Sequence, residues 1–288
     1  MIQLLVAGLT VGSTYALVAL GIHIILRATR AINFAQGDFV VLGGLFALSF
    51  VEVLHVNIWV ALLGSTALGF VLGGLYERFI LRAAARLSEG AVMIASIGTV
   101  YVLLYGHALI WGNEPQPLPT FSTAQQLQVG GATIAVQSIW VIGLLGVMLA
   151  VLYVFFERTT YGKAIRAAAN DPIGARLSGI NVNRARSISA AISIALATFA
   201  GTIVGPITLV GGSNGVTITV KGFVGAILGG LASPVGCTVG GLLVGLIETL
   251  LGSRFAHDLV DPLVYAILLV VLLLRPQGLF GGRRIARD

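Results

Sequence analysis

The sequence predicts an all-α membrane protein, a polytopic bundle of eight to nine transmembrane helices forming a single domain over residues 1–288. Hydrophobic residues make up 57% of the chain and charged residues 10%, whereas roughly a quarter of the residues in a soluble domain are charged. The mean hydropathy is +0.99. Apolar runs of about 20 residues, the length that crosses a bilayer as a helix, recur as far as Arg275 with only short polar breaks.

Six spans follow from the lengths of the apolar runs and from the charged, Pro and Gly residues that interrupt them. The first run has no basic segment before it and no small-residue cleavage site after it. We therefore expect it to be a retained span and not a signal peptide. The six predicted spans are 4–26, 32–55, 58–80, 92–111, 137–156 and 187–210.

The region after the sixth span leaves the number of spans open. Segments 216–232 and 236–251 are short and rich in glycine, and the residues 233–236 separate them. They are compatible with two spans, or with a re-entrant or broken helix near 216–236 followed by one span. The last apolar run, 259–274, predicts a further span.

The distribution of basic residues predicts the orientation. With nine spans, the N-terminus lies outside and the C-terminus in the cytoplasm, and 15 of the 17 Lys and Arg residues, all but Lys221 and Arg254, then fall on the cytoplasmic side. Segment 112–137 contains no Lys or Arg, as the positive-inside rule expects of an external loop. Its tail, 126–136, is compatible with a short hairpin, although we favour a solvated connector. The net charge of +6 thus reports orientation, and no nucleic acid is expected as a partner.

A polar stretch at 159–181 interrupts the apolar pattern. Asp171 suits an N-cap, Pro172 the first helical position and Gly179 the left-handed residue after a helix end. These residues predict a short helix, Pro172 to Ser178. An ordinary basic cytoplasmic loop would show the same charge bias, so the local pattern leaves a docking segment and a plain loop both open.

Several longer segments resemble one known family in the same order along the chain. The match runs nearly from end to end, and the family is that of the permease subunits of bacterial branched-chain amino acid ABC importers, of the LivH type. The segments are GLTVGSTYALVALG (8–21), AINFAQGDFVVLGG (31–44), GKAIRAAANDPIGARLSGI (162–180), KGFVGAILGGLASPVGCTVGGLLVGLIETL (221–250) and LLRPQGLFG (273–281).

The resemblance implies a transmembrane permease subunit that translocates branched-chain or related amino acids across the bacterial inner membrane. It implies four kinds of neighbour: a homologous permease subunit, two cytoplasmic ATP-binding subunits, a periplasmic solute-binding protein and membrane lipid. The chain has no G-x-x-x-x-G-K-[ST] motif, because its only Gly-Lys pair is followed by alanine. We therefore expect no cofactor in this chain, no catalytic residue, and ATP with Mg²⁺ in the partner ATPase.

In that family the loop before the sixth span resembles the place where permeases meet the ATPase. The resemblance thus implies that 159–181 is a cytoplasmic coupling segment. The expected contact residues are Gly162, Lys163, Arg166, Asp171, Ala175 and Gly179.

Polar residues inside apolar segments predict the translocation pathway, because charge in hydrocarbon is costly and usually lines a cavity. Asn33, Gln36 and Asp38 lie near the start of the second predicted span, with Asp38 about 9 Å into the helix. An ion pair of Asp38 with Arg27 or Arg30 is the alternative interpretation.

A second group of polar residues, including Thr217 and Lys221, surrounds the glycine-rich break near 211–215. Gly-interrupted apolar segments indicate transport sites, because unwound backbone in a membrane is tolerated where it lines a cavity. Glu248 is expected to meet Arg254 near a membrane face.

Other functions remain as alternatives. A urea or short-chain amide permease of the same family fits the same motifs, and a self-sufficient channel or secondary transporter would also lack an ATP site. Residues 211–215 spell G-x-S-x-G, but a hydrolase nucleophile needs a strand-turn-helix at that motif. No H-E-x-x-H or Cys/His spacing predicts a metal site.

Overall fold

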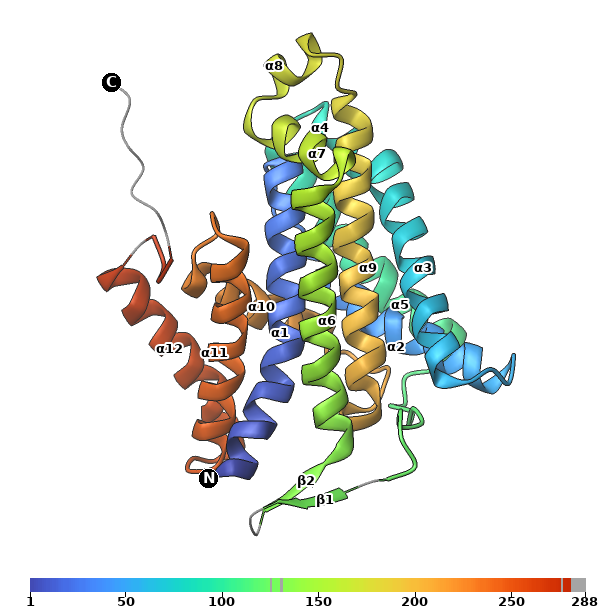
Figure 1. Cartoon of the computed structure of the whole chain (residues 1–288), viewed down its shortest axis with the longest axis vertical. Coiled ribbons are helices and arrows are strands. Elements are labelled where there is room, and N and C mark those ends of the chain that lie inside the picture. The colour runs from blue at the N-terminus through green and yellow to red at the C-terminus, as the bar shows by residue number, and fades with distance from the viewer. Residues whose placement is uncertain (125, 130–131, 276, 281–288) are drawn as a thin grey trace.

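The chain folds into a bundle of helices with one small hairpin (Figure 1). The structure is a computed structural model that describes residues 1–124, 126–129, 132–275 and 277–280. The all-α prediction is confirmed. The helices are α1 (Ile2–Thr29), α2 (Gln36–Glu52), α3 (Ile58–Tyr76), η1 (Glu77–Leu81, a π-helical turn), α4 (Arg82–Ala85), α5 (Glu89–Trp111), α6 (Val136–Arg158), α7 (Thr160–Asn170), α8 (Pro172–Leu177), α9 (Val182–Thr208), α10 (Gly215–Gly229), α11 (Pro234–Gly252) and α12 (His257–Leu274); the strands are β1 (Gln126–Val129) and β2 (Ala132–Ala135).

Every predicted span contains a helix, but the count of eight to nine spans is not confirmed. Within the described residues, six helical segments are long and apolar enough to cross a membrane: α1, α3 with its continuation to Ala85, α5, α6, α9 and α11. Two others are shorter, with 17 residues in α2 and 15 in α10. Both are preceded by non-helical backbone, 31–35 and 209–214, which shortens them relative to the apolar runs that contain them.

The helices form two sets that run in opposite directions. α1 leads away from the N-terminus toward the end of the molecule that carries α7 and α8, and α9 starts beside α8 and runs back (Figure 1). α1 packs against α10 and α11, α9 packs against α2 and α3, and α2 and α10 contact each other. α1 and α9, the most buried of the long helices, therefore form the centre of the bundle.

Small residues let the crossing helices approach closely. A Cβ on Gly12 of α1 would lie 2.8 Å from the carbonyl oxygen of Leu242 in α11, and a Cβ on Gly245 would overlap the backbone of Gly12. In α3, a Cβ on Gly73 would lie 2.6 Å from the carbonyl oxygen of Ala190 in α9. The glycines therefore allow the dispersion contacts that associate helices in lipid.

The segment predicted as a solvated connector is instead anchored to the bundle. β1 and β2 form an antiparallel hairpin, with Gln126 opposite Ala135. Gln116 and Val210 exchange both backbone hydrogen bonds at 2.8 Å. The Gln137 amide accepts from the N–H of Phe121 at 3.1 Å and donates to the carbonyl of Ile203 at 2.8 Å. Backbone hydrogen bonds between residues that are far apart in the sequence hold this loop on the end of α9. Local composition gives no signal of such pairing.

Candidate functional site

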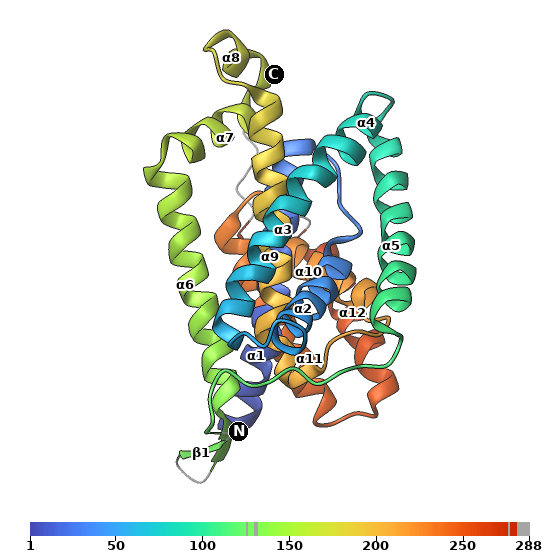
Figure 2. The same ribbon diagram turned by 90° about the vertical axis from the view of Figure 1, so that its right-hand side faces the viewer.

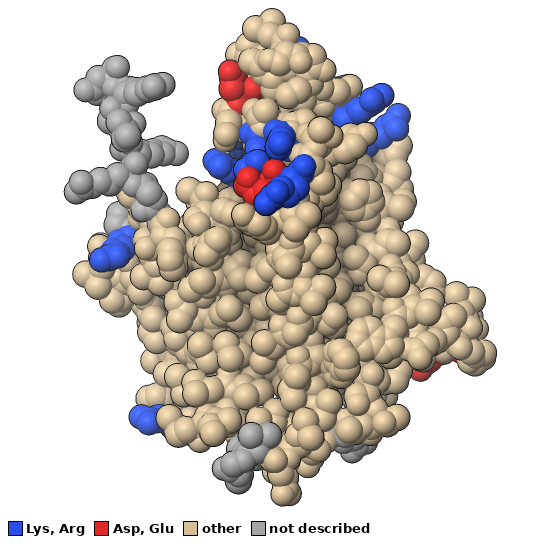
Figure 3. Space-filling model, viewed as in Figure 1, with Lys and Arg blue, Asp and Glu red and all other residues tan. Residues whose placement is uncertain are grey.

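A helical segment protrudes from one end of the bundle. α6 and α9 rise to this end, α7 lies across it, and α8 reaches furthest from the bundle (Figure 2). Lys and Arg side chains gather at the same end, below α8 (Figure 3). This is the segment for which the sequence predicts a partner contact.

The local prediction for α8 is confirmed. The Asp171 carboxylate accepts hydrogen bonds from the backbone N–H groups of Ile173 and Gly174, both at 3.0 Å. Pro172 occupies the first turn, and Gly179 has a φ of 80° after the helix end. α8 ends at Leu177, one residue before the predicted end.

Three of the six residues predicted to contact an ATPase instead hold this segment on the bundle. A Cβ on Gly162 would overlap the carbonyl oxygen of Phe155 in α6. Ala175 is buried in a small apolar cluster with residues of α7 and α9. The Arg166 guanidinium forms an ion pair with Glu157 of α6. Lys163 is exposed.

The sequence analysis missed the apolar surface of α8. Ile173 is 71% exposed and Leu177 is 86% exposed, and residues four apart share one face of a helix. The signal was present as two large apolar side chains four residues apart in an otherwise polar stretch. An exposed apolar face on a protruding helix indicates a protein-contact surface.

The second site is buried, where the first turns of α2 and α10 meet. The N–H of Gly37 donates to the hydroxyl of Thr219 at 2.7 Å. A Cβ on Gly37 would overlap the carbonyl oxygen of Gly215, the first residue of α10. Glycine at position 37 is thus what allows two short helices to touch inside the bundle.

Asp38 lies at this junction, and two expectations about it are corrected. Because α2 begins at Gln36, Asp38 is in its first turn and not about 9 Å into a helix. Its side chain is 1% exposed and, among the described residues, makes no ion pair with Arg27 or Arg30. A Cβ on Gly215 would overlap the Asp38 carboxylate, so the carboxylate is packed against the start of α10.

Asn33 and Gln36 form a satisfied hydrogen-bond network. Asn33 donates to the Gln36 side-chain oxygen at 3.2 Å and accepts from the Tyr76 hydroxyl at 3.0 Å. The Gln36 amide donates to the carbonyl of Ser193 at 2.9 Å, and the Ser193 hydroxyl donates to the carbonyl of Gly21 at 2.7 Å. This network links α1, α2, α3 and α9.

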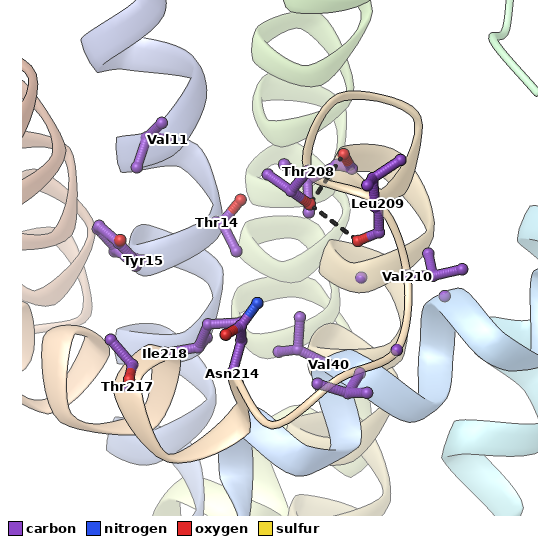
Figure 4. Close-up of a pocket in the computed structure, with 15 residues that line it drawn as sticks. Val11, Thr14, Tyr15, Val40, Thr208, Leu209, Val210, Asn214, Thr217 and Ile218 are labelled. Carbon is purple, nitrogen blue, oxygen red and sulfur yellow. Dashed lines mark hydrogen bonds between the residues drawn. The ribbon is translucent and has the colours of Figure 1, made fainter. Parts of the chain in front are cut away.

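A cavity of about 210 Å³ lies on the other side of the junction, between α1, α2, α9 and α10 (Figure 4). Of the predicted pathway residues, Thr217 lines it, whereas Asn33, Gln36, Asp38 and Lys221 do not. The sequence analysis missed Thr14 and Asn214 as lining residues. Their helices face each other only in the folded bundle, so no local signal identified Thr14.

Lys221 belongs to a separate charged cluster. Its ammonium lies 2.9 Å from Glu248 of α11 and 2.8 Å from Asp261 of α12, and 5.9 Å from the ring centroid of Tyr15. The expectation that Glu248 meets Arg254 is therefore wrong. α10 and α11 pack against each other, which brings Lys221 to Glu248 and leaves one carboxylate in excess within the cluster.

The sequence matches a known family along nearly all of its length. A family model described as branched-chain amino acid transport system / permease component matches residues 4–273. The chain belongs to this family.

Individual members of the permease family support this assignment. The chain is 29% identical over 299 residues to the high-affinity branched-chain amino acid transport system permease protein BraD of Pseudomonas aeruginosa, covering 99% of this chain and 97% of that protein. It is 28% identical over 302 residues to LivH of Escherichia coli K12, with the same coverage. The ribose import permease protein RbsC of that organism is 26% identical over 275 residues, covering 90% of this chain and 82% of RbsC.

A solved structure supports the fold. The chain superposes on PsaBC from Streptococcus pneumoniae, determined in complex with Fab, with a TM-score of 0.53 and 16% identity, covering 97% of this chain and 93% of that chain. At this identity the likeness concerns the fold alone.

Proposed function

We propose that this family member is the membrane permease subunit of an ATP-driven importer for branched-chain or related amino acids. The observation that carries the proposal is the protruding α8, with its exposed Ile173 and Leu177, in a chain whose family membership extends from end to end. BraD and LivH are named as branched-chain amino acid permeases. An apolar docking face on a transport subunit calls for a protein partner.

The proposed assembly has two permease chains in the membrane and two ATP-binding subunits below it. A homologous permease chain would pair with this one, and two ATPases that bind ATP and Mg²⁺ would dock on α8 from the cytoplasm. A periplasmic solute-binding protein would dock on the opposite end, near β1 and β2. This orientation places the N-terminus outside and the C-terminus in the cytoplasm, in agreement with the gathering of Lys and Arg at the α7–α8 end (Figure 3).

The contacts suggest how an ATPase movement reaches the bundle. Ala175 of α8 packs with Ile165 of α7 and with Val182 at the start of α9. Further along α9, the carbonyl of Ser193 accepts a hydrogen bond from Gln36 and so belongs to the polar network that links α1, α2, α3 and α9. A displacement of α8 would therefore move α9, which would shift as a rigid helix. That shift would break or form the hydrogen bonds of the network and would switch access between the two sides of the membrane.

The test replaces the docking face and measures both assembly and transport. The double variant Ile173→Ser, Leu177→Ser is expected to lose co-purification with the ATPase and to reduce ATP-dependent leucine uptake at least about tenfold, because central apolar anchors dominate such interfaces. Leu87→Ser is the matched control, since Leu87 is 82% exposed in the loop between α4 and α5.

Three outcomes would each contradict part of the proposal. Normal ATPase binding and uptake by the double variant would remove α8 from the contact. Full-rate leucine movement by the purified chain alone, in liposomes without any partner, would identify a self-sufficient channel or secondary transporter instead. Uptake of urea or acetamide but not leucine by the complete complex would favour the amide permease.

A further inference from the structure

The cavity between α1, α2, α9 and α10 has the chemistry of a binding site for one class of solute. We propose that it binds the transported amino acid itself, with the branched apolar side chain against its aliphatic walls and the polar end at Thr14 and the first turn of α10. The inference rests on the proposed function and deepens it. It places part of the solute selection in the membrane subunit.

The size of the cavity suits a small amphiphilic solute. Its volume is about 210 Å³, whereas an engineered apolar cavity of about 150 Å³ is large enough to bind benzene. An aliphatic side chain of four carbons therefore fits with room left for an amino and a carboxylate group.

The walls are mostly branched aliphatic side chains. α2, α9 and α10 contribute Val40, Val41, Val204 and Ile218. β-Branched residues are stiff about χ1, so these walls form a surface of fixed shape. Burial of an apolar solute surface against them is favourable in proportion to its area, and urea offers no such surface while acetamide offers one methyl group.

Polar groups without partners face the same space. Thr14 is 5% exposed, and its hydroxyl has no hydrogen-bond partner among the described residues. Its side chain extends from α1 into the cavity (Figure 4). Because a buried hydroxyl without a partner is unfavourable, a solute that accepts from or donates to Thr14 gains a hydrogen bond on binding.

The start of α10 offers a second polar contact. Asn214, its N-cap, makes no side-chain cap hydrogen bond, and the first N–H groups of a helix lack partners within the helix. Asn214 and Thr217 both line the cavity. The end of α10 with partial positive charge favours a carboxylate, which an amino acid carries and urea or acetamide does not.

The test measures leucine binding to the purified chain in nanodiscs, with no ATPase or binding protein present. Radiolabelled leucine is expected to bind the unaltered protein and to be displaced by valine and isoleucine but not by urea or acetamide. Thr14→Val keeps the side-chain shape and is expected to weaken binding about tenfold through the lost hydrogen bond. Thr10→Val is the matched control, because Thr10 is also buried in α1 but bonds to the carbonyl of Val6 and does not line the cavity.

A second variant gives a gain instead of a loss. Val204→Ala enlarges the cavity and is expected to shift binding from leucine toward phenylalanine, whereas Val244→Ala, at a site 1% exposed in α11 and away from the cavity, is expected to leave the preference unchanged. A gain for phenylalanine also shows that the variant is folded.

The outcomes separate this inference from the proposed function. Absence of leucine binding up to millimolar concentration, equal binding by Thr14→Val, or displacement by acetamide would overturn the inference while ATP-driven uptake by the whole complex stays intact. Failure of the proposed function would appear differently, as missing ATPase association in a chain that still binds leucine.

Discussion

The α8 face and the α2–α10 junction depart from the usual burial of side chains in opposite directions. α8 exposes two large apolar residues, Ile173 and Leu177, at the end of the molecule furthest from the bundle. The junction and the cavity beside it instead contain buried polar side chains, Asp38 at the junction and Thr14 in the cavity wall. Both groups are poorly placed for an isolated chain, because exposed apolar area and buried unpaired polar atoms are each unfavourable.

The difference indicates two kinds of missing partner. An exposed apolar face is completed by a protein surface, which removes it from water. A buried polar group beside a cavity is completed by a small solute that brings its own donors and acceptors. Substitutions in the α8 face are therefore expected to leave the isolated chain folded and to impair assembly of the complex. Substitutions at the junction are expected to impair folding itself.

The largest expected effect tests how tightly the junction is packed. Gly37→Leu places a side chain where the backbone of Gly215 and Thr219 already lies, and overpacking of this kind costs about 3 kcal/mol or more. We expect the variant to lose folded protein altogether, measured as the monodisperse peak in fluorescence-detected size-exclusion chromatography.

A matched glycine shows whether the loss is specific to the junction. Gly98 lies in α5, and a Cβ added there meets no atom within 4 Å. Gly98→Leu is expected to fold normally. Equal peaks for both variants would mean that α2 and α10 do not meet as closely as Gly37 indicates.

A smaller effect is expected at the charged cluster of Lys221. Lys221→Met leaves Glu248 and Asp261 without their cation, and loss of one partner of a buried ion pair costs about 3–5 kcal/mol. Because Asp261 is 45% exposed, we expect the lower part of that range, measured as a reduced thermal unfolding temperature in detergent.

Neutralising the whole cluster distinguishes a stabilising role from a role in transport. The triple variant Lys221→Met, Glu248→Gln, Asp261→Asn leaves no buried charge and is expected to regain thermal stability and leucine uptake. A triple variant that is stable but does not take up leucine would instead support the predicted role of Lys221 in the translocation pathway.

The smallest effect on folding is expected at Arg166. Its ion pair with Glu157 is exposed on both sides, 44% and 43%, and such pairs contribute about 0–1 kcal/mol. Arg166→Glu is expected to insert normally and to abolish uptake, because it reverses a charge beside the proposed ATPase contact. The measurement is leucine uptake at equal protein level.

A charge swap distinguishes a contact of Arg166 with the ATPase from a structural role in holding α7 on α6. Arg166→Glu combined with Glu157→Arg restores the ion pair between α6 and α7 but not the charge at position 166. We expect uptake to remain lost. Recovery of uptake would show that Arg166 acts by holding α7 on α6.

The sequence predicted the parts of the fold that depend on neighbouring residues. Apolar length located a helix in every predicted span, and the cap residues Asp171 and Gly179 fixed α8 to within one residue. The end-to-end resemblance identified the family. The candidate site was harder to predict, because hydropathy located polar residues in apolar runs but not what lies opposite them.

Three features were decided only by the tertiary structure. Gln36, the first residue of α2, is paired because α2 and α9 pack together, which brings its amide to the carbonyl of Ser193. Lys221 meets Glu248 and Asp261 because α10, α11 and α12 pack together. Thr14 faces a cavity because α1 crosses α9 and α10 there. Hydropathy and capping act over a few residues, so the sequence by itself determined the helices, the orientation signal and the family. Contacts between different helices, from 27 positions apart for Lys221 and Glu248 to 157 for Gln36 and Ser193, decided which polar groups are paired and which face a cavity.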